Sequence, residues 1–253
     1  MSKYIKSKDN SFYKNLNSLN KRKNRYKKNK FIIEGNKLVE EAILSDVKIK
    51  ALIYKESKYE EVKINSDIDE YILSDSLFRE LSYMENSEGI IALCSFLKNK
   101  DTYGDKIIVL DKLNDPGNLG TIIRSSEAFG FNDILLTEGT VDFYNSKVLR
   151  GAMGSIFRQN IKYINYEDLK ELKKQGYKIY AMALEENSIN IQDIKHNDKI
   201  IIIVGNEANG ISEEVKTIAD SFIIIPMKGI IESLNAGVAA STSMFYFDLI
   251  NCK

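Results

Sequence analysis

The sequence predicts an α/β protein whose second half is built on a mostly parallel sheet with helices on both faces. Short apolar runs alternate with longer polar-apolar segments along the chain, which is the pattern of strands alternating with helices. The runs at 107–110 and 200–204 are apolar without interruption, as expected of strands buried on both faces. Polar, glycine-containing patches follow several runs, and open α/β sheets bind ligands beyond the carboxyl ends of their strands.

The first half is predicted to be a small α/β domain. Its expected strands are 31–34, 51–54, 70–73 and 89–96, and its expected helices are one ending at 44, a polar one at 57–62 and one at 76–83. The segment 97–105 is polar and contains Gly104, which makes it the best linker candidate. We therefore divide the chain into domains 1–97 and 106–253.

The second half alternates more regularly. Its expected strands are 107–110, 133–137, 161–164, 178–184, 200–204 and 222–225, and its expected helices are 118–129, 145–153, 166–174, 212–219 and 233–250. The last helix carries small residues at Ala236, Gly237, Ala239 and Ala240. This order of elements predicts a parallel sheet covered by helices.

Composition excludes several classes of protein. With 43% apolar residues in 253, the chain has the make-up of an ordinary globular protein. No segment is long and apolar enough to span a bilayer, and residues 1–6 lack the apolar stretch of a signal peptide, so we expect no membrane partner and a cytoplasmic location. Cys94, Cys252 and the single histidine, His196, lie far apart, so we expect no metal site, no disulfide and no histidine-based hydrolase.

Charge is uneven although it sums to zero. Residues 3–30, here called the basic run, hold eleven lysines and arginines against one acid, Asp9. Such a run attracts polyanions, and its interleaved aromatic residues Tyr4, Phe12, Tyr13 and Tyr26 are suited to stacking on unpaired bases. A solvated helix in a lysine-rich chain explains the same pattern, and the sequence leaves both interpretations open.

Three polar patches in the second half predict one composite site, since loops after parallel strands meet at one edge of a sheet. They are Asn114-Asp115-Pro116-Gly117-Asn118-Leu119-Gly120 with Arg124, then Gly205-Asn206-Glu207-Ala208-Asn209-Gly210, then Ile225-Pro226-Met227-Lys228-Gly229 with Ser233-Leu234-Asn235. The second patch has the glycine spacing of a P-loop but carries Ile211 where the phosphate-binding lysine belongs, so a nucleoside triphosphatase is disfavoured. No G-x-G-x-x-G follows a strand, which argues against an ordinary dinucleotide fold.

These patches resemble the three motifs of the SpoU-TrmH family of RNA 2′-O-ribose methyltransferases, within the SPOUT class. Residues 114–124 resemble its first motif, N-P-x-N-x-G-x-x-x-R, residues 205–210 its G-x-E-x-x-G motif, and residues 225–235 its I-P-M…S-L-N motif. Three motifs in order over about 150 residues are specific, whereas one alone is weak. Residues 31–35 with the helix after them resemble the family's small ribosomal-protein-like, substrate-binding domain.

The resemblance implies a SPOUT domain with a deep trefoil knot, S-adenosylmethionine as cofactor, RNA as substrate with ribosomal RNA favoured, and a homodimer whose site is completed across the interface. By motif position, the cofactor-binding residues are Gly205, Asn206, Ile225, Met227, Leu234, Asn235 and Leu184. The implied catalytic set is Arg124, Asn118, Glu207, Ser233 and Asn235. Asn118 and Glu207 are expected to hold Arg124, while Ser233 and Asn235, near the start of the last helix, order the loop and the ribose.

Methyl transfer to a ribose hydroxyl is an in-line displacement that needs alignment and removal of a proton. The arginine that matches Arg124 is often proposed as the base in this family, but a guanidinium is essentially never deprotonated, so we favour phosphate positioning and stabilisation of the developing alkoxide. Methylation of 23S ribosomal RNA is the leading hypothesis. Methylation of tRNA, an antibiotic-resistance rRNA methyltransferase and an RNA-binding protein without catalysis are the alternatives.

Overall fold

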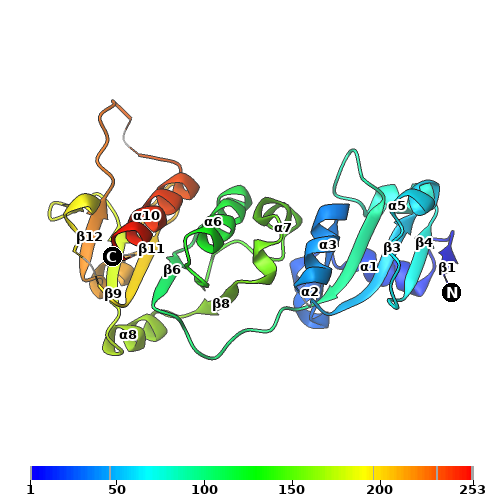
Figure 1. Ribbon diagram of the computed structural model, residues 1–253, viewed down its shortest axis with the longest axis horizontal. Coiled ribbons are helices and arrows are strands. Elements are labelled where there is room, and N and C mark those ends of the chain that lie inside the picture. Colours follow the sequence, from blue (N-terminus) through cyan, green and yellow to red (C-terminus); the bar gives the residue numbers. More distant parts are fainter. Residues whose placement is uncertain (1, 46, 196, 232, 252–253) are drawn as a thin grey trace. The chain divides into compact units, whose positions relative to one another are not determined.

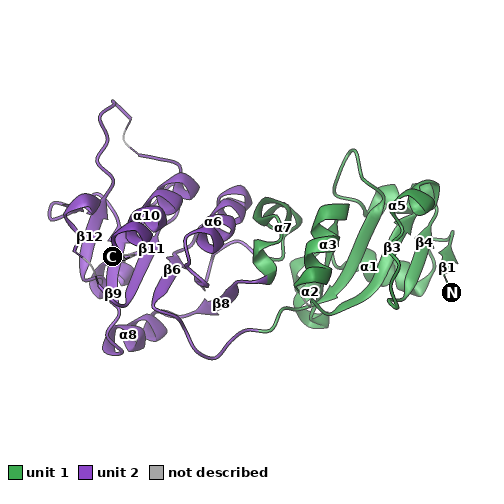
Figure 2. Ribbon diagram, in the orientation of Figure 1, with its two compact units in different colours: residues 1–98, 144–157 green, residues 99–143, 158–253 purple. Residues whose placement is uncertain are grey.

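The computed structural model describes residues 2–45, 47–195, 197–231 and 233–251. The chain separates into two compact units (Figure 2). Unit 1 contains residues 1–98 and 144–157, and unit 2 contains residues 99–143 and 158–253. The segment 144–157 therefore packs with the first half of the chain, although its sequence position lies within the second.

Unit 1 has a mixed five-stranded sheet in the order β1-β4-β3-β5-β2. β5 pairs antiparallel with β2 and β3, whereas β4 runs parallel to both β3 and β1. The strands are β1 (Lys3–Ile5), β2 (Lys30–Glu34), β3 (Ile49–Lys55), β4 (Glu70–Leu73) and β5 (Ile90–Ser95). The helices are α1 (Ser11–Ser18), α2 (Arg22–Lys28), α3 (Asn36–Leu44), α4 (Tyr59–Val62), α5 (Asp75–Leu81) and α7 (Ser146–Ala152), with 3-10 turns at Glu56–Lys58 and Ser155–Phe157.

The basic run is a folded part of unit 1, because it forms β1, α1 and α2 (Figure 1). Tyr13 is buried in the core between α1, α5 and the sheet. The ring of Phe12 stacks on a tyrosine of β4 with centroids 3.7 Å apart, and Tyr26 packs edge-on against Phe96. Tyr13 is therefore not available to nucleic acid bases, whereas Phe12 and Tyr26 are half-buried and Tyr4 is 61% exposed. Stacking of these three rings on bases stays a prediction.

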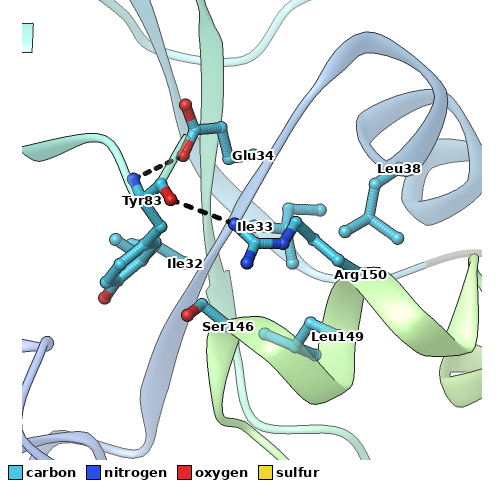
Figure 3. Close-up of a pocket in the computed structure, with 8 residues that line it drawn as sticks. All are labelled: Ile32, Ile33, Glu34, Leu38, Tyr83, Ser146, Leu149 and Arg150. Atoms are coloured by element: carbon cyan, nitrogen blue, oxygen red, sulfur yellow. Dashed lines mark hydrogen bonds between the residues drawn. The ribbon is translucent and has the colours of Figure 1, made fainter. Parts of the chain in front are cut away.

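A small pocket in unit 1 lies between β2, α3 and α7 (Figure 3). The carboxylate of Glu34 on its wall is buried and accepts hydrogen bonds from the backbone amide of Tyr83 at 2.9 Å and from the hydroxyl of Ser87 at 2.6 Å. Arg150 of α7 donates to the carbonyl of Tyr83 at 3.2 Å. These polar groups form hydrogen bonds within the protein. The bonds of Glu34 hold the 82–87 loop against the sheet, and the bond of Arg150 links α7 to that loop.

Unit 2 has a seven-stranded sheet in the order β10-β12-β9-β11-β6-β7-β8, in which every pair of neighbours is parallel. The strands are β6 (Lys106–Leu110), β7 (Asp133–Thr137), β8 (Asn160–Ile164), β9 (Lys178–Met182), β10 (Ile189–Asn190), β11 (Ile200–Val204) and β12 (Ser221–Ile224). The helices are α6 (Pro116–Ala128), α8 (Tyr166–Lys174), α9 (Glu213–Ile218) and α10 (Ala236–Asn251), with a 3-10 turn at Ile191–Asp193. This confirms the predicted α/β class and parallel sheet.

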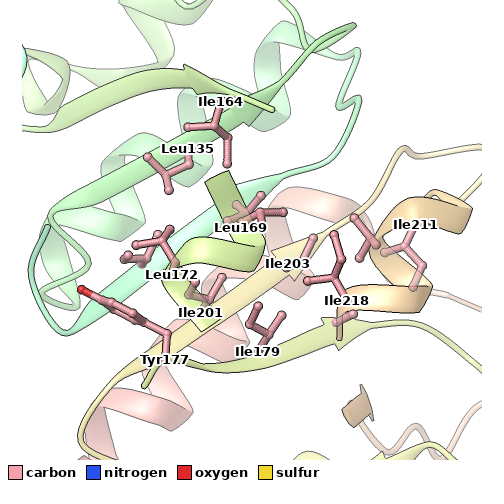
Figure 4. Packing of buried hydrophobic residues seen from close by; sticks show 14 residues of the cluster. Leu135, Ile164, Leu169, Leu172, Tyr177, Ile179, Ile201, Ile203, Ile211 and Ile218 are labelled. Carbon is pink, nitrogen blue, oxygen red and sulfur yellow. The ribbon is translucent and has the colours of Figure 1, made fainter. Parts of the chain in front are cut away.

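Helices cover both faces of the unit 2 sheet, because its strands are apolar on both sides. On one face, Leu169 and Leu172 of α8 and Val215 and Ile218 of α9 pack against alternate residues of the central strands (Figure 4). On the other face lie α6 and α10, where the ring of Phe247 packs on that of Tyr180 from β9, 5.2 Å between centroids. The sheet is thereby fixed as a rigid platform for the loops at its edges.

The structure tests only part of what the composition and the family resemblance predict. Cys94 is buried as expected, whereas Cys252 and His196 lie outside the described residues. The trefoil knot stays a prediction. Across the described ranges, no helix has the length and apolar character needed to cross a bilayer. The same residues contain no cluster of three or more histidine, cysteine or acidic side chains arranged to hold a metal ion.

Candidate functional site

The loops that carry the three motifs leave neighbouring strands at the same edge of the unit 2 sheet. β12, β9, β11 and β6 lie next to one another and all run parallel. The segment after β6 leads into α6, the segment after β11 leads into α9, and the segment after β12 leads into α10. Because the carboxyl ends of parallel strands share an edge, motifs separated by about 90 residues in the chain meet there.

The first motif forms the start of α6. The side chain of Asp115 caps the helix by accepting from the backbone amide of Asn118 at 2.8 Å, and Pro116 occupies the first turn, where no amide hydrogen is needed. The helix thus begins at Pro116, two residues before the start that the sequence predicts, Asn118. Asn118 is itself buried, so its side-chain amide must find partners within the protein.

Glu207 of the second motif supplies one of those partners. Its carboxylate accepts hydrogen bonds from the side-chain nitrogen of Asn118 at 2.9 Å and from the backbone amides of Asn114 at 3.1 Å and Asp115 at 3.0 Å. Burial alone raises the pKa of this carboxyl, but the hydrogen bonds from Asn118 and from the backbone hold the pKa of Glu207 below its ordinary value. The ionised side chain of Glu207 therefore holds the loop that contains Asn114 and Asp115 by hydrogen bonds.

Asn235 of the third motif completes the connection. Its side-chain nitrogen donates to the side-chain oxygen of Asn118 at 2.9 Å. Its side-chain oxygen accepts from the backbone amides of Gly237 at 3.0 Å and Val238 at 3.2 Å, which caps α10. Both ends of the Asn118 amide are thereby used, and Glu207, Asn118 and Asn235 form one continuous hydrogen-bonded chain across the three motifs.

The second loop needs glycine at its first position. Asn206 and Gly210 exchange two backbone hydrogen bonds of 2.8 and 2.9 Å, which folds 205–210 into a tight turn. A Cβ atom at Gly205 would lie 2.3 Å from the carbonyl carbon of Gly210, closer than any side chain can approach. The side chain of Asn206 also donates to the carbonyl of Lys112 at 2.9 Å, so this turn is tied to the first loop at a second point.

Asp111 is a site residue that sequence reasoning missed. It follows β6 directly and is fully buried, and its carboxylate accepts from the backbone amide of Ser212 at 2.7 Å, the hydroxyl of Tyr166 at 2.9 Å and the hydroxyl of Thr137 at 3.1 Å. It therefore fixes the start of α9 relative to the end of β6. The available signal was an acid placed directly after a strand buried on both faces.

Of the seven predicted cofactor-binding residues, five follow the ends of β9, β11 and β12, and two, Leu234 and Asn235, directly precede α10. Leu184 is 82% exposed and Met227 is 39% exposed, while Ile225 and Leu234 are half-buried. Apolar side chains together with a polar backbone turn suit a ligand with an apolar ring and polar edges. The residues present therefore fit an adenosine-containing cofactor, and the assignment of these individual residues to its binding stays a prediction.

Two predicted catalytic residues do not join the hydrogen-bonded chain. Arg124 lies on α6, six residues after Asn118, and is exposed. Within the described residues its guanidinium has no ion pair or hydrogen bond, and Asn118 and Glu207 bind each other instead of holding it. Ser233 is exposed and precedes α10, where the capping role that the sequence divided between Ser233 and Asn235 falls to Asn235. The role of each in catalysis stays a prediction.

Comparisons with known proteins identify the family of each part of the chain. The SpoU rRNA Methylase family matches residues 105–245, and the MRM3-like substrate binding domain matches residues 10–92. The chain is 36% identical to the 23S rRNA (guanosine(2553)-2′-O)-methyltransferase RlmP of Bacillus subtilis over 96% of this chain and 98% of that protein.

Solved structures show the same architecture over nearly the whole chain. The AdoMet-bound rRNA methyltransferase of Sinorhizobium meliloti superimposes with a TM-score of 0.85 at 26% identity, covering 97% of each chain. The SpoU methyltransferase AviRb of Streptomyces viridochromogenes, in complex with AdoMet, has the same fold with a TM-score of 0.83 at 20% identity, covering 95% of this chain and 97% of that one. With three linked motif loops at one sheet edge and a match over residues 105–245, the chain belongs to the SpoU rRNA Methylase family.

Proposed function

We propose that this protein transfers the methyl group of S-adenosylmethionine to the ribose 2′-hydroxyl of one guanosine in 23S ribosomal RNA, at the position that corresponds to the target of the Bacillus subtilis relative. The observation that carries the proposal is the hydrogen-bonded chain from Glu207 through Asn118 to Asn235. An RNA-binding protein without catalysis has no need for an intact polar network between three loops. The end-to-end similarity to a 23S methyltransferase favours ribosomal RNA over tRNA.

In the proposed mechanism, the motif loops hold the cofactor and the guanidinium of Arg124 acts on the RNA. S-adenosylmethionine, when bound, supplies an electrophilic methyl group on a sulfonium. The 205–210 turn and the apolar side chains at 184, 225, 227 and 234 would hold it, and Asn118 keeps the loops around it in register. Arg124 is exposed, and its guanidinium would bind the phosphate beside the target ribose and stabilise negative charge on the 2′ oxygen. As the methyl–oxygen bond forms, the methyl–sulfur bond would break and the 2′ proton would pass to solvent water.

We assign RNA binding to domain 1–97 and methyl transfer to domain 106–253. The match of residues 10–92 to a substrate binding domain supports the first assignment. The cytoplasm, where ribosomal RNA is made in bacteria, is the location that this function requires.

A homodimer is part of the proposal. Val238, Thr242, Phe245 and Leu249 are exposed on α10 and recur at intervals of four, three and four residues, so they form one stripe along the helix. Three of the four are apolar, and an apolar stripe of this kind is covered by a partner in most proteins that expose one. Since Asn235 caps the start of α10, a partner seated on this stripe would lie next to the site.

Mapping of 2′-O-methyl groups tests the function. RNA from cells with and without this gene is compared, and the expected result is loss of one methylated guanosine in 23S rRNA with tRNA unchanged. Purified protein should then methylate an in-vitro-transcribed 23S fragment that contains this guanosine, and a 2′-deoxy substitution at that nucleotide should abolish the reaction. Loss of a tRNA modification with 23S rRNA intact would refute the substrate, and binding of RNA without any methyl transfer would refute the activity.

A further inference from the structure

Four of the nine lysines of the basic run are each close to an acid of unit 1. The pairs are Lys3 with Asp69 at 3.8 Å, Lys6 with Glu56 at 3.5 Å, Lys8 with Glu80 at 2.6 Å and Lys14 with Asp9 at 2.8 Å. Their positive charge is compensated locally, so this part of the basic run offers little attraction to a polyanion.

Lys30, another lysine of the run, lies at one end of the unit 1 sheet beside two lysines from outside the run. Lys30 opens β2 and pairs with Ser95 of β5. The backbone amide of Ser95 in turn donates to the carbonyl of Lys48 at 3.0 Å, which places Lys48 on the other side of β5. Lys50 follows two residues later in β3, so the strand pairing brings residues 30, 48 and 50 to the same end of the sheet.

The backbone is irregular at this point. The pairing of β3 with β5 shifts register between Ile49 and Ala51, which leaves Lys50 as the extra residue of a bulge. A bulge redirects a side chain, and Lys50 stands two residues from Lys48 at this point of the sheet. The pKa of Lys50 is lowered, chiefly by the charge of Lys48, then by slight desolvation and by the side chain of Lys48, with a further contribution from the charge of Lys30.

Among the described residues, these three lysines have no acidic partner. Lys48 and Lys50 are exposed and Lys30 is half-buried, and none of the three forms an ion pair with any carboxylate in the described part of the chain. Three positive charges held together without compensation repel one another, and a bound anion would remove that repulsion. The group lies on an open sheet end, so it suits an extended anion more than a small one that needs an enclosing pocket.

We propose that Lys30, Lys48 and Lys50 form a phosphate-binding surface that contacts the backbone of the substrate RNA. The proposal rests on the proposed function and deepens it, because it assigns RNA contact to one end of the unit 1 sheet and excludes the acid-paired lysines of the same basic run. Lysine binds phosphate as a point charge and reads no base, so the surface positions the RNA and leaves recognition of the target nucleotide to other residues.

The test compares two triple variants of the full-length protein that lose the same number of positive charges. K30Q/K48Q/K50Q removes the proposed surface, and K3Q/K6Q/K8Q removes acid-paired lysines. Affinity for an in-vitro-transcribed 23S rRNA fragment is measured over a series of KCl concentrations. The plot of log affinity against log salt should become shallower by about two to three for the first variant, about one per lost phosphate contact, and should stay near the wild-type slope for the second.

Two results would overturn the proposal. One is a wild-type salt slope in K30Q/K48Q/K50Q, and the other is an equal loss in both variants, which would mean that only net charge matters. Thermal unfolding and S-adenosylmethionine binding, both expected at wild-type values, show that each variant is folded. If the wild-type protein neither binds nor methylates the fragment, the proposed function itself fails, whereas unchanged salt slopes with intact methylation refute the lysine surface alone.

Discussion

At the scale of single residues, Arg124 is set apart from the rest of the site. Its guanidinium is exposed and, in the ranges that the structure describes, has no partner, while Glu207, Asn118 and Asn235 bind one another. Free donors are what a group needs if it is to bind substrate, since an arginine committed to a carboxylate has fewer left for a phosphate.

We therefore expect Arg124→Ala to lower the single-turnover rate of methyl transfer about 100- to 1000-fold, the usual loss when one group that stabilises developing charge is removed. S-adenosylmethionine affinity should not change, because Arg124 forms no hydrogen bond or ion pair with the described residues of the loops that would hold the cofactor. The methyl-transfer rate of Arg124→Lys should fall between the rates of wild type and Arg124→Ala, since lysine keeps the charge and loses the planar fork. Single-turnover kinetics and calorimetry measure the two quantities, and a full rate in Arg124→Ala would contradict both roles considered for this residue.

Glu207 makes a pH-dependent contribution. Its pKa is lowered in the folded protein, so the stability that it provides is fully present above the unfolded pKa of about 4.3 and is lost as the pH falls through the folded value. Glu207→Gln removes the charge and keeps the shape. The gap in melting temperature between wild type and Glu207→Gln should be constant from pH 7 to 5 and should shrink below about pH 4.

The same substitution should weaken S-adenosylmethionine binding at neutral pH about tenfold, roughly the worth of one hydrogen bond to a charged group. Thermal unfolding across pH and calorimetry at pH 7 provide the measurements. A melting-temperature gap that persists unchanged at pH 3.5 would show that the carboxylate is not what holds the first loop.

At the scale of elements, the start of α10 combines two functions in one side chain. The oxygen of Asn235 caps the helix, and its nitrogen reaches Asn118 on α6. Asn235→Asp keeps the cap, and a carboxylate is favourable at a helix start, but it replaces the donor toward Asn118 with an acceptor. Asn235→Ala loses both contacts.

We expect Asn235→Ala to lower the free energy of unfolding by about 1 kcal/mol, the typical cost of a lost cap. Asn235→Asp should stay within about 0.5 kcal/mol of wild type and still lose at least tenfold in methylation rate. Chemical denaturation and methylation assays on both variants separate the two functions. If Asn235→Asp retains wild-type activity, the bond to Asn118 is not needed for catalysis.

Most elements were predictable because their signals are local. β7, β11 and α8 have the bounds that the sequence predicts, since each is an apolar run or an amphipathic segment ended by turn residues. The elements of the basic run were missed because charged residues dominate them. Only two or three apolar side chains, such as Tyr13 and Leu16, fix α1 to the core, and their importance depends on the sheet that they cover.

At the scale of the whole molecule, the exposed stripe on α10 predicts the oligomeric state. Leu249→Glu would place a charge without a partner in the proposed interface, which costs several kcal/mol when buried. We expect the dimer to dissociate about 100 times more readily than wild type in analytical ultracentrifugation. Leu44→Glu is the control, because Leu44 is 83% exposed on unit 1 and the substitution is chemically the same. Equal masses for wild type and both variants would place the interface elsewhere.

The sequence by itself determined the fold class, the family and the identity of the three motif loops, because strand and helix periodicity, turn residues and motif spacing are encoded over short stretches. Only the tertiary structure decided which side chains meet. It paired Glu207 and Asn235 through Asn118, left Arg124 without a partner in the described residues, and revealed Asp111 as the buried anchor of α9. It also divided the basic run into compensated and uncompensated charges. The physical reason is that hydrogen bonds and ion pairs act over a few ångströms between residues that strand order brings together, and strand order is a property of the assembled sheet.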